Sequence, residues 1–133
     1  MNFTATNLSS APVIATITVT PVFENGGVTN EGDSVSFTIT VNPSAQVDQP
    51  LDQLVCIGDT TSIVEFATQN TGGTTTYTWT NNTPSIGLSD SGTGDVLAFT
   101  ATNSSTEPVV ATITVTPTFE NGGIDCDGED KTF

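Results

Sequence analysis

Apolar and polar residues alternate with a period of two along several short stretches of the chain. Between residues 14 and 20, Ala15, Ile17 and Val19 face one way and the intervening threonines face the other. This pattern is typical of a β-strand with one buried and one solvated face. The same alternation marks further stretches, at 37–41, 64–66, 76–80, 99–102 and 110–116. Tyr77 and Trp79 share a face with the apolar set, so we expect both in the core rather than in a sugar-stacking surface.

Glycine-containing stretches separate these strands and predict turns. They are Asn25-Gly26-Gly27, Thr71-Gly72-Gly73, Asp90-Ser91-Gly92-Thr93-Gly94 and Asn121-Gly122-Gly123. Threonine is abundant, leucine is scarce, and helix signals are almost absent. Short alternating strands joined by such turns predict an all-β fold, an immunoglobulin-like antiparallel β-sandwich with about seven strands per unit.

The chain also repeats itself. Residues Phe3–Gly27 and Phe99–Gly123 are identical at 20 of 25 positions, at an offset of 96 residues. A period of this length matches one small domain in a tandem array rather than a solenoid unit. We therefore divide the chain into 1–43, the later part of one repeat, and 44–133, a nearly complete repeat that lacks its final strand. We expect an excerpt of a longer protein, with 42–50 as a stiff, proline-containing linker.

Because the second repeat lacks its final strand, one of its other strands is expected to be left without a partner. Phe37 corresponds to Phe133, so the first repeat continues with Thr38–Val41 where the chain stops. A sandwich without its closing strand exposes an unpaired edge. Residues 36–42 are predicted to complete either their own unit or the second unit of a neighbouring molecule, which would give dimers or chains.

The charge balance limits the classes of molecule that the chain is expected to bind. The 133 residues include 15 Asp and Glu, one Lys and no Arg or His, for a net charge of −14. Such a chain is not expected to bind nucleic acid or to insert into membranes, because it lacks both basic groups and a long apolar stretch. The carboxylates serve either as a repulsive, solubilising coat or as ligands for cations. Catalysis through histidine is excluded, and no carboxylate pair is recognisable as catalytic, so we expect no enzyme activity.

Two features carry candidate chemistry. The segment Asp125-Cys126-Asp127-Gly128-Glu129-Asp130 contains four carboxylates, which suit either a solvated loop or a Ca²⁺ site made of Asp125, Asp127, Glu129 and Asp130. It is not an EF-hand, because its glycine is misplaced. Cys56 and Cys126 both fall in the second repeat, and they are either joined in a disulfide or two free thiols. No other cofactor is expected.

The segments FTITVNP, LVCIGD, YTWTNNTPSIGLSDSGTGDV and ATITVTP resemble the repeats of giant cell-surface proteins of Bacteroidota. The closest group is the SprB-type gliding-motility adhesins, whose repeats are PKD-like (Ig-like) domains. The resemblance covers essentially the whole chain. It implies a long filament on the extracellular cell surface, exported by type IX secretion. In the related repeats, cysteines commonly stand at the places of Cys56 and Cys126, but the first unit has Asn30 at the second place.

Our interpretation is a structural repeat of a filamentous surface adhesin, supplying reach and stiffness. Its partners would be the neighbouring repeats, and the parent protein would contact a surface or polysaccharide. The alternative is a Ca²⁺-dependent glycan- or surface-binding module acting through residues 125–130. A remote third interpretation is an accessory domain of a secreted carbohydrate-active enzyme. Near-identical tandem copies favour the first.

Overall fold

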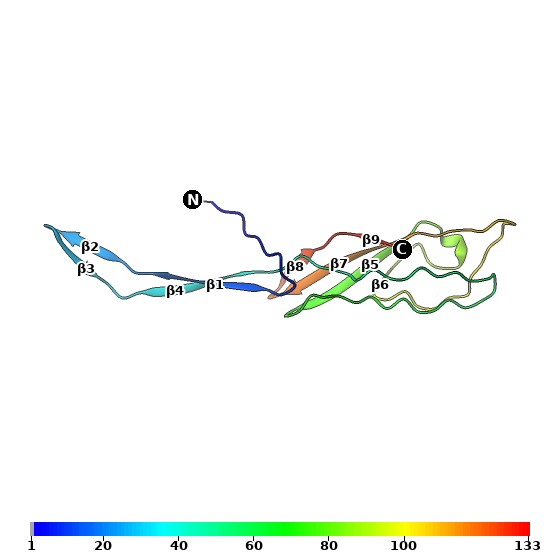
Figure 1. Cartoon of the computed structure of the whole chain (residues 1–133), viewed down its shortest axis with the longest axis horizontal. Coiled ribbons are helices and arrows are strands. Elements are labelled where there is room, and N and C mark those ends of the chain that lie inside the picture. Colours follow the sequence, from blue (N-terminus) through cyan, green and yellow to red (C-terminus); the bar gives the residue numbers. More distant parts are fainter. Residues whose placement is uncertain (1) are drawn as a thin grey trace.

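The computed structural model describes residues 2–133, and it is a long, narrow molecule (Figure 1). Met1, the first residue of the predicted preceding repeat, lies outside the described residues. Antiparallel strands form nearly all of the regular structure, which confirms the predicted all-β class. Within residues 2–133 the single helical element is the short 3-10 turn η1 (Pro84–Ile86).

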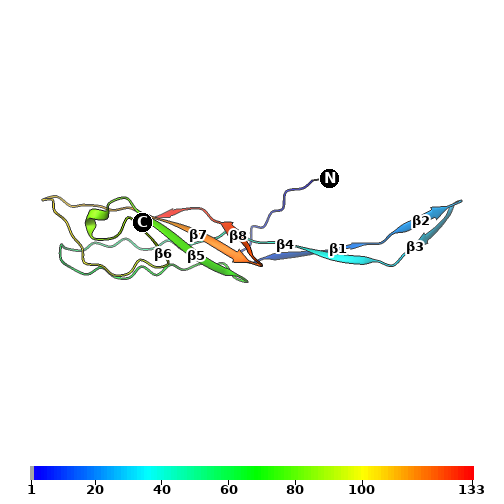
Figure 2. The same cartoon turned by 180° about the vertical axis from the view of Figure 1, so that it is seen from behind.

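The first repeat is a two-stranded ribbon that extends away from the rest of the molecule (Figures 1 and 2). Strand β1 (Val13–Val19) pairs with β4 (Val35–Val41), and β2 (Val22–Asn25) pairs with β3 (Val28–Glu31). Residues 36–41 thus pair within their own unit. Between the two ladders, two residues of one side oppose three of the other, and the Gly32 N–H donates to the Pro21 carbonyl at 2.9 Å. The ribbon therefore carries a bulge at Pro21.

The second repeat contains a five-stranded sheet with a packed core. Its strands are β5 (Thr74–Asn81), β6 (Ser91–Thr93), β7 (Ile113–Asn121), β8 (Ile124–Asp127) and β9 (Lys131–Thr132). The order is β6-β5-β7-β8, and β9 also pairs with β7. Extended segments pack against this sheet, joined to each other by isolated bridges at Thr60–Thr100 and Val64–Val96. The core comprises Val47, Trp79, Val96, Ile113 and Val115, with Val64, Phe66, Tyr77, Leu88 and Phe133 against it. The predicted core positions of Tyr77 and Trp79 are confirmed.

The two repeats fold their shared sequence into the same hairpin. The Gly128 N–H donates to the Pro117 carbonyl at 3.0 Å, as Gly32 does to Pro21 96 residues earlier. Likewise, Ile113 and Phe133 exchange both main-chain hydrogen bonds, matching the paired residues Ile17 and Phe37. The register of the hairpin is thus a property of the repeated sequence, independent of what covers it.

The two copies of the hairpin differ in how far their apolar side chains are buried. Phe119 and Val115 are 0% exposed, whereas their counterparts Phe23 and Val19 are 69% and 48% exposed. Strand β5 pairs along β7 through eight residue pairs, and the extended segments cover its apolar face. Among residues 2–133 nothing covers the ribbon in that way. The apolar face is therefore built into the repeated sequence, and in the second repeat residues 44–101 cover it.

Two sequence predictions need correction. The predicted linker at 42–50 is instead largely part of the second unit, because Pro43, Ala45 and Val47 are all buried. Their alternation with exposed residues is that of a strand-like core segment. The predicted turn at 90–94 contains β6, which pairs with β5 across Trp79 and Gly92. A Cβ on Gly92 would lie 2.2 Å from Cζ2 of Trp79, so only glycine lets the indole lie against this backbone.

Candidate functional site: the inter-repeat joint and an open groove

The first feature is a joint between the ribbon and the second repeat. The Asn42 side-chain amide donates to the Asn121 carbonyl at 3.1 Å, and the Asn121 amide donates to Oδ1 of Asn42 at 2.9 Å. Both side chains are half-buried. Asn121 is at the end of β7, and Asn42 directly follows β4. The pair therefore ties the base of one repeat to the hairpin turn of the next.

A second set of contacts secures the other side of the joint. The Thr71 N–H donates to the Ser10 carbonyl at 2.9 Å. Pro12 packs closely against Gly72, where an added Cβ would meet its Cδ at 3.0 Å. The Asn70 side-chain amide also donates to the Ser10 carbonyl at 3.4 Å. Both sides of the base of the ribbon are therefore attached to the second repeat.

The acidic segment is spread along the hairpin. Asp127 accepts a hydrogen bond from Thr118 at 2.9 Å, and Asp130 accepts one from Thr116. Asp125 is opposite Glu120 in the β7–β8 register, and Glu129 is exposed. Within residues 2–133, no three acidic, cysteine or histidine side chains gather as metal ligands would. The threonine partners explain the spread, since each holds a carboxylate against β7. The Ca²⁺ site remains a prediction.

The two cysteines are in different elements. Cys126 is half-buried in β8 opposite Phe119, and Cys56 is exposed. Cys56 belongs to a turn in which its carbonyl accepts from the Asp59 N–H at 3.1 Å. Both are free thiols in this structure, and a disulfide between them stays a prediction.

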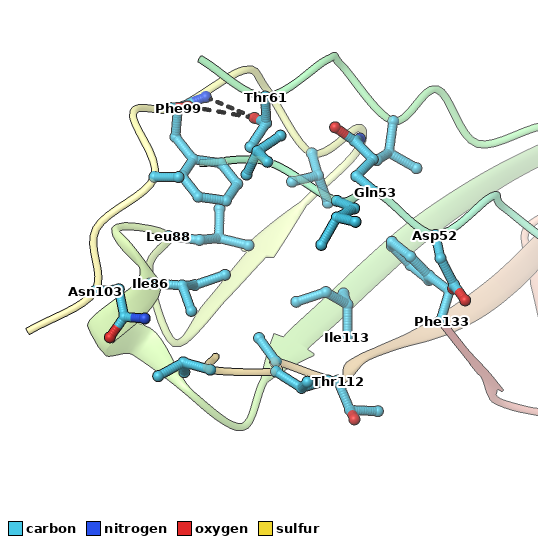
Figure 3. A pocket seen from close by; sticks show the side chains of 18 of the residues that line it. Asp52, Gln53, Thr61, Ile86, Leu88, Phe99, Asn103, Thr112, Ile113 and Phe133 are labelled. Carbon is cyan, nitrogen blue, oxygen red and sulfur yellow. Dashed lines mark hydrogen bonds between the residues drawn. The ribbon is translucent and has the colours of Figure 1, made fainter. Parts of the chain in front are cut away.

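The second feature is an open groove at the far end of the second repeat, with a volume of about 840 Å³. It lies between the segments 51–55 and 108–113 (Figure 3). Ile86, Leu88 and Ile113 point into it, with Phe133 at one end. Leu54 on its rim is fully exposed. The groove is thus mainly apolar and bounded by two extended chain segments.

An asparagine turn borders the groove and recurs in both repeats. The Asn103 amide donates to the Glu107 carbonyl at 2.9 Å, and the Asn7 amide donates to the Ala11 carbonyl at the same distance. Asn7 makes one further bond, from the same amide to the carbonyl of Val41 at 2.8 Å. Asn103 lines the groove at the corresponding place.

Neither the Asn42–Asn121 pair nor the turns at Asn7 and Asn103 were predicted from the sequence. Asn121 was placed in a predicted turn, and Asn7 and Asn103 were given no role, although each copy of the repeat places an asparagine in FTATN and in FENGG. That recurrence was the available signal. The bonding partners were not readable, because Val41 and Asn42 are distant in sequence from Asn7 and Asn121.

Comparison of the chain with protein-family models, with curated proteins and with solved structures gives no match in any of the three. In the described part of the chain, no helix has both the length and the apolar character needed to cross a membrane.

Proposed function

We propose that this chain is a structural tandem repeat of a long, filamentous cell-surface adhesin, serving gliding motility or surface attachment. Its role is to supply reach and stiffness, and it performs no catalysis. The observation that carries the proposal is the joint, in which Asn42 and Asn121 bond reciprocally and Thr71 bonds to Ser10. A joint of this kind adds one repeat to the next in a defined direction, so that length grows with copy number.

The sequence supports the same role. Two near-identical copies at an offset of 96 residues are suited to building length, and a net charge of −14 keeps neighbouring filaments apart. The resemblance to SprB-type repeats of Bacteroidota adds the location, an extracellular filament exported by type IX secretion. Adhesive specificity would then reside elsewhere in the parent protein.

The stiffness of the joint is tested by small-angle scattering on the whole chain. Replacing both Asn42 and Asn121 with alanine should shorten the largest dimension and broaden the distribution of distances. Asn25→Ala is the matched control, because Asn25 holds the place of Asn121 in the first repeat and contacts no second unit. A double variant as extended and as rigid as the parent would overturn the stiff-joint proposal.

The cellular role needs a separate experiment in the organism that carries the chain. Antibodies against it should label intact cells, and deletion of whole repeats should shorten the surface filament in proportion while attachment to a surface persists. Labelling only after permeabilisation would refute the surface location. Loss of attachment on deletion of a single repeat would instead favour a binding module.

The Ca²⁺-dependent binding module has no observation among residues 2–133 that favours it over the spacer. Thermal unfolding in Ca²⁺ and in chelator decides the metal question. A Ca²⁺-dependent rise in midpoint, removed by Asp127→Asn with Asp130→Asn, would establish the site.

A further inference from the structure

Two asparagine–glycine pairs stand at corresponding places in the two hairpins. Asn25-Gly26 is at the end of β2 and Asn121-Gly122 is at the end of β7, each inside the same five residues, FENGG. An asparagine followed by glycine is chemically labile, because the glycine nitrogen can attack the side-chain Cγ with no β-carbon in its way. The two hairpins therefore carry the same reactive sequence in two structural settings.

The reaction replaces a side-chain amide with a carboxylate. The glycine nitrogen loses its proton and bonds to Cγ, and the bond between Cγ and Nδ2 breaks as ammonia leaves. Water then adds to a carbonyl of the resulting succinimide ring and opens it, giving aspartate or isoaspartate. Asparagine and water are thus converted to an acid and ammonia, with no oxidant or reductant. Each event adds a negative charge to the chain.

In the second repeat, the amide that would leave is one of the groups that close the joint. Nδ2 of Asn121 donates to Oδ1 of Asn42 at 2.9 Å, and the Asn121 carbonyl accepts from the Asn42 amide at 3.1 Å. Cγ must turn toward the Gly122 nitrogen to react, and that rotation breaks the bond from Nδ2. The turn is restrained further, because the Gly123 N–H donates to Oε1 of Glu120 at 2.8 Å. The closed joint therefore opposes the reaction at Asn121.

The setting of Asn25 is different. Its side chain is exposed, and among residues 2–133 its contact across the turn is the main-chain pairing with Val28. Strand β2 pairs with β3 alone, and isolated two-stranded ribbons are marginally stable. Local opening frees the backbone for ring closure. Within this chain, Asn25 thus reports how fast the shared sequence reacts without a joint.

The two members of the joint pair also differ in reactivity. Asn42 is followed by Pro43, whose nitrogen carries no proton, so Asn42 has no route to the neutral ring. The labile member is Asn121. We propose that Asn121 is a site of spontaneous deamidation, that its bond to Asn42 protects it while the joint is closed, and that its reaction leaves the joint permanently loosened.

Deamidation would act on the joint in two ways. Aspartate or isoaspartate at position 121 has no side-chain N–H to donate to Oδ1 of Asn42. The new carboxylate also directly follows Glu120, which is opposite Asp125 in the β7–β8 register, so it adds a like charge to this end of the hairpin. Opening of the joint exposes Asn121, and its reaction then opposes reclosure. This inference rests on the hydrogen bonds of the joint and not on the proposed adhesin role.

The test is peptide mapping of the whole chain during incubation in mildly alkaline buffer. Chymotrypsin cuts after Phe23 and Phe119, which gives two peptides that begin with ENGG and differ in mass. Mass spectrometry then follows deamidation at Asn25 and Asn121 in the same sample. Asn25 should react roughly tenfold faster, the factor that two ordinary hydrogen bonds supply. In urea the two rates should become equal, because the local sequences are the same. A native Asn121 that reacts as fast as Asn25 would overturn the proposal.

Asn42→Ala separates the joint from the rest of the fold. It should raise the rate at Asn121 roughly tenfold, since both hydrogen bonds are lost, and leave the rate at Asn25 unchanged. Gln49→Ala is the matched control, because it removes a hydrogen bond to Thr132 in the same repeat and leaves both bonds of Asn121 in place. It should change neither rate. An Asn121 that stays slow in Asn42→Ala would refute protection by the joint.

Asn121→Asp tests the consequence for the joint. The Thr71 N–H, which donates to the Ser10 carbonyl across the joint, should exchange with solvent several-fold faster than in the parent. Asn25→Asp adds the same charge to the ribbon and should leave the exchange of Thr71 unchanged. Unaltered exchange in Asn121→Asp would overturn the loosening. These readouts are rates rather than molecular dimensions, so they succeed or fail whether or not scattering finds the joint stiff.

Discussion

Because the hairpin sequence occurs twice, a side chain in the second repeat can be compared with the residue 96 positions earlier in the first. Phe119 is fully buried and Phe23, 96 residues earlier, is largely exposed. Phe119→Ala should cost about 3–5 kcal/mol of unfolding free energy, because it removes a large side chain and leaves a cavity. Phe23→Ala, the same change in the same local sequence, should cost roughly 0.5 kcal/mol or less. Urea denaturation of both variants measures the difference, and equal costs would mean that the ribbon face is covered in solution.

Gly128 and Gly32 form a second matched pair. A Cβ on Gly128 would lie 2.0 Å from the Ala45 carbonyl oxygen, whereas one on Gly32 would meet only Pro21, at 3.0 Å from its Cγ. Gly128→Ala should therefore lower the thermal midpoint markedly, since two backbones must separate. Gly32→Ala should have a much smaller effect. A reversed order would contradict the close packing of segment 45–50 against the hairpin.

Tyr77 is the sole tyrosine, and burial raises the pKa of its phenol above the ordinary value of 10.0. The nearby carboxylates of Asp48 and Asp95 raise the pKa further, while a hydrogen bond with Thr68 lowers it. The unfolded chain then loses this proton at lower pH than the folded one, so stability should fall as the pH rises past 10.0. Phenolate absorbance gives the pKa directly. Tyr77→Phe should remove this part of the alkaline loss of stability, and an unchanged profile would contradict the assignment.

Whole elements differ between the copies as well. Strand β7 pairs with β5 on one edge and with β8 and β9 on the other, whereas β1 pairs only with β4. Amide protons of β1 should therefore exchange with solvent much faster than those at the same places in β7, because opening the ribbon exposes little core. Hydrogen exchange read residue by residue makes this comparison, with Ile17 against Ile113 as the clearest pair. Equal protection would indicate that the ribbon has a partner in solution.

Much of the fold was predictable from local pattern, and the failures have physical causes. Alternation at 14–20 predicted β1 correctly, and that at 110–116 predicted the first part of β7, which begins at Ile113. The strands predicted at 64–66 and 99–102 are instead extended segments with single bridges at Val64 and Thr100. The turn predicted at 90–94 was wrong at 91–93, because Gly92 lies in β6 and packs against Trp79. The linker predicted at 42–50 was wrong because prolines were weighted over the alternation of Pro43, Ala45 and Val47. Immunoglobulin-like topology beyond the antiparallel all-β class stays a prediction.

The candidate site was less predictable than the fold. The groove between 51–55 and 108–113 was not predicted, because its position depends on long-range packing. The composition of the acidic segment suggested a Ca²⁺ site, yet its carboxylates bond to neighbouring threonines such as Thr118. The joint was not predicted, because Asn42 and Asn121 are 79 residues apart and no local sequence pattern indicates that they bond.

The molecule as a whole carries a net charge of −14 with Lys131 as its one basic side chain, so copies repel one another. The carboxylates within one copy repel one another as well, and salt screens that repulsion over a Debye length of about 10 Å at 0.1 M. Raising the salt concentration should therefore raise the thermal midpoint of the chain. Thermal unfolding at several NaCl concentrations makes the measurement. A midpoint that falls with salt would show that attraction between charges, through Lys131 or a bound cation, stabilises the fold instead.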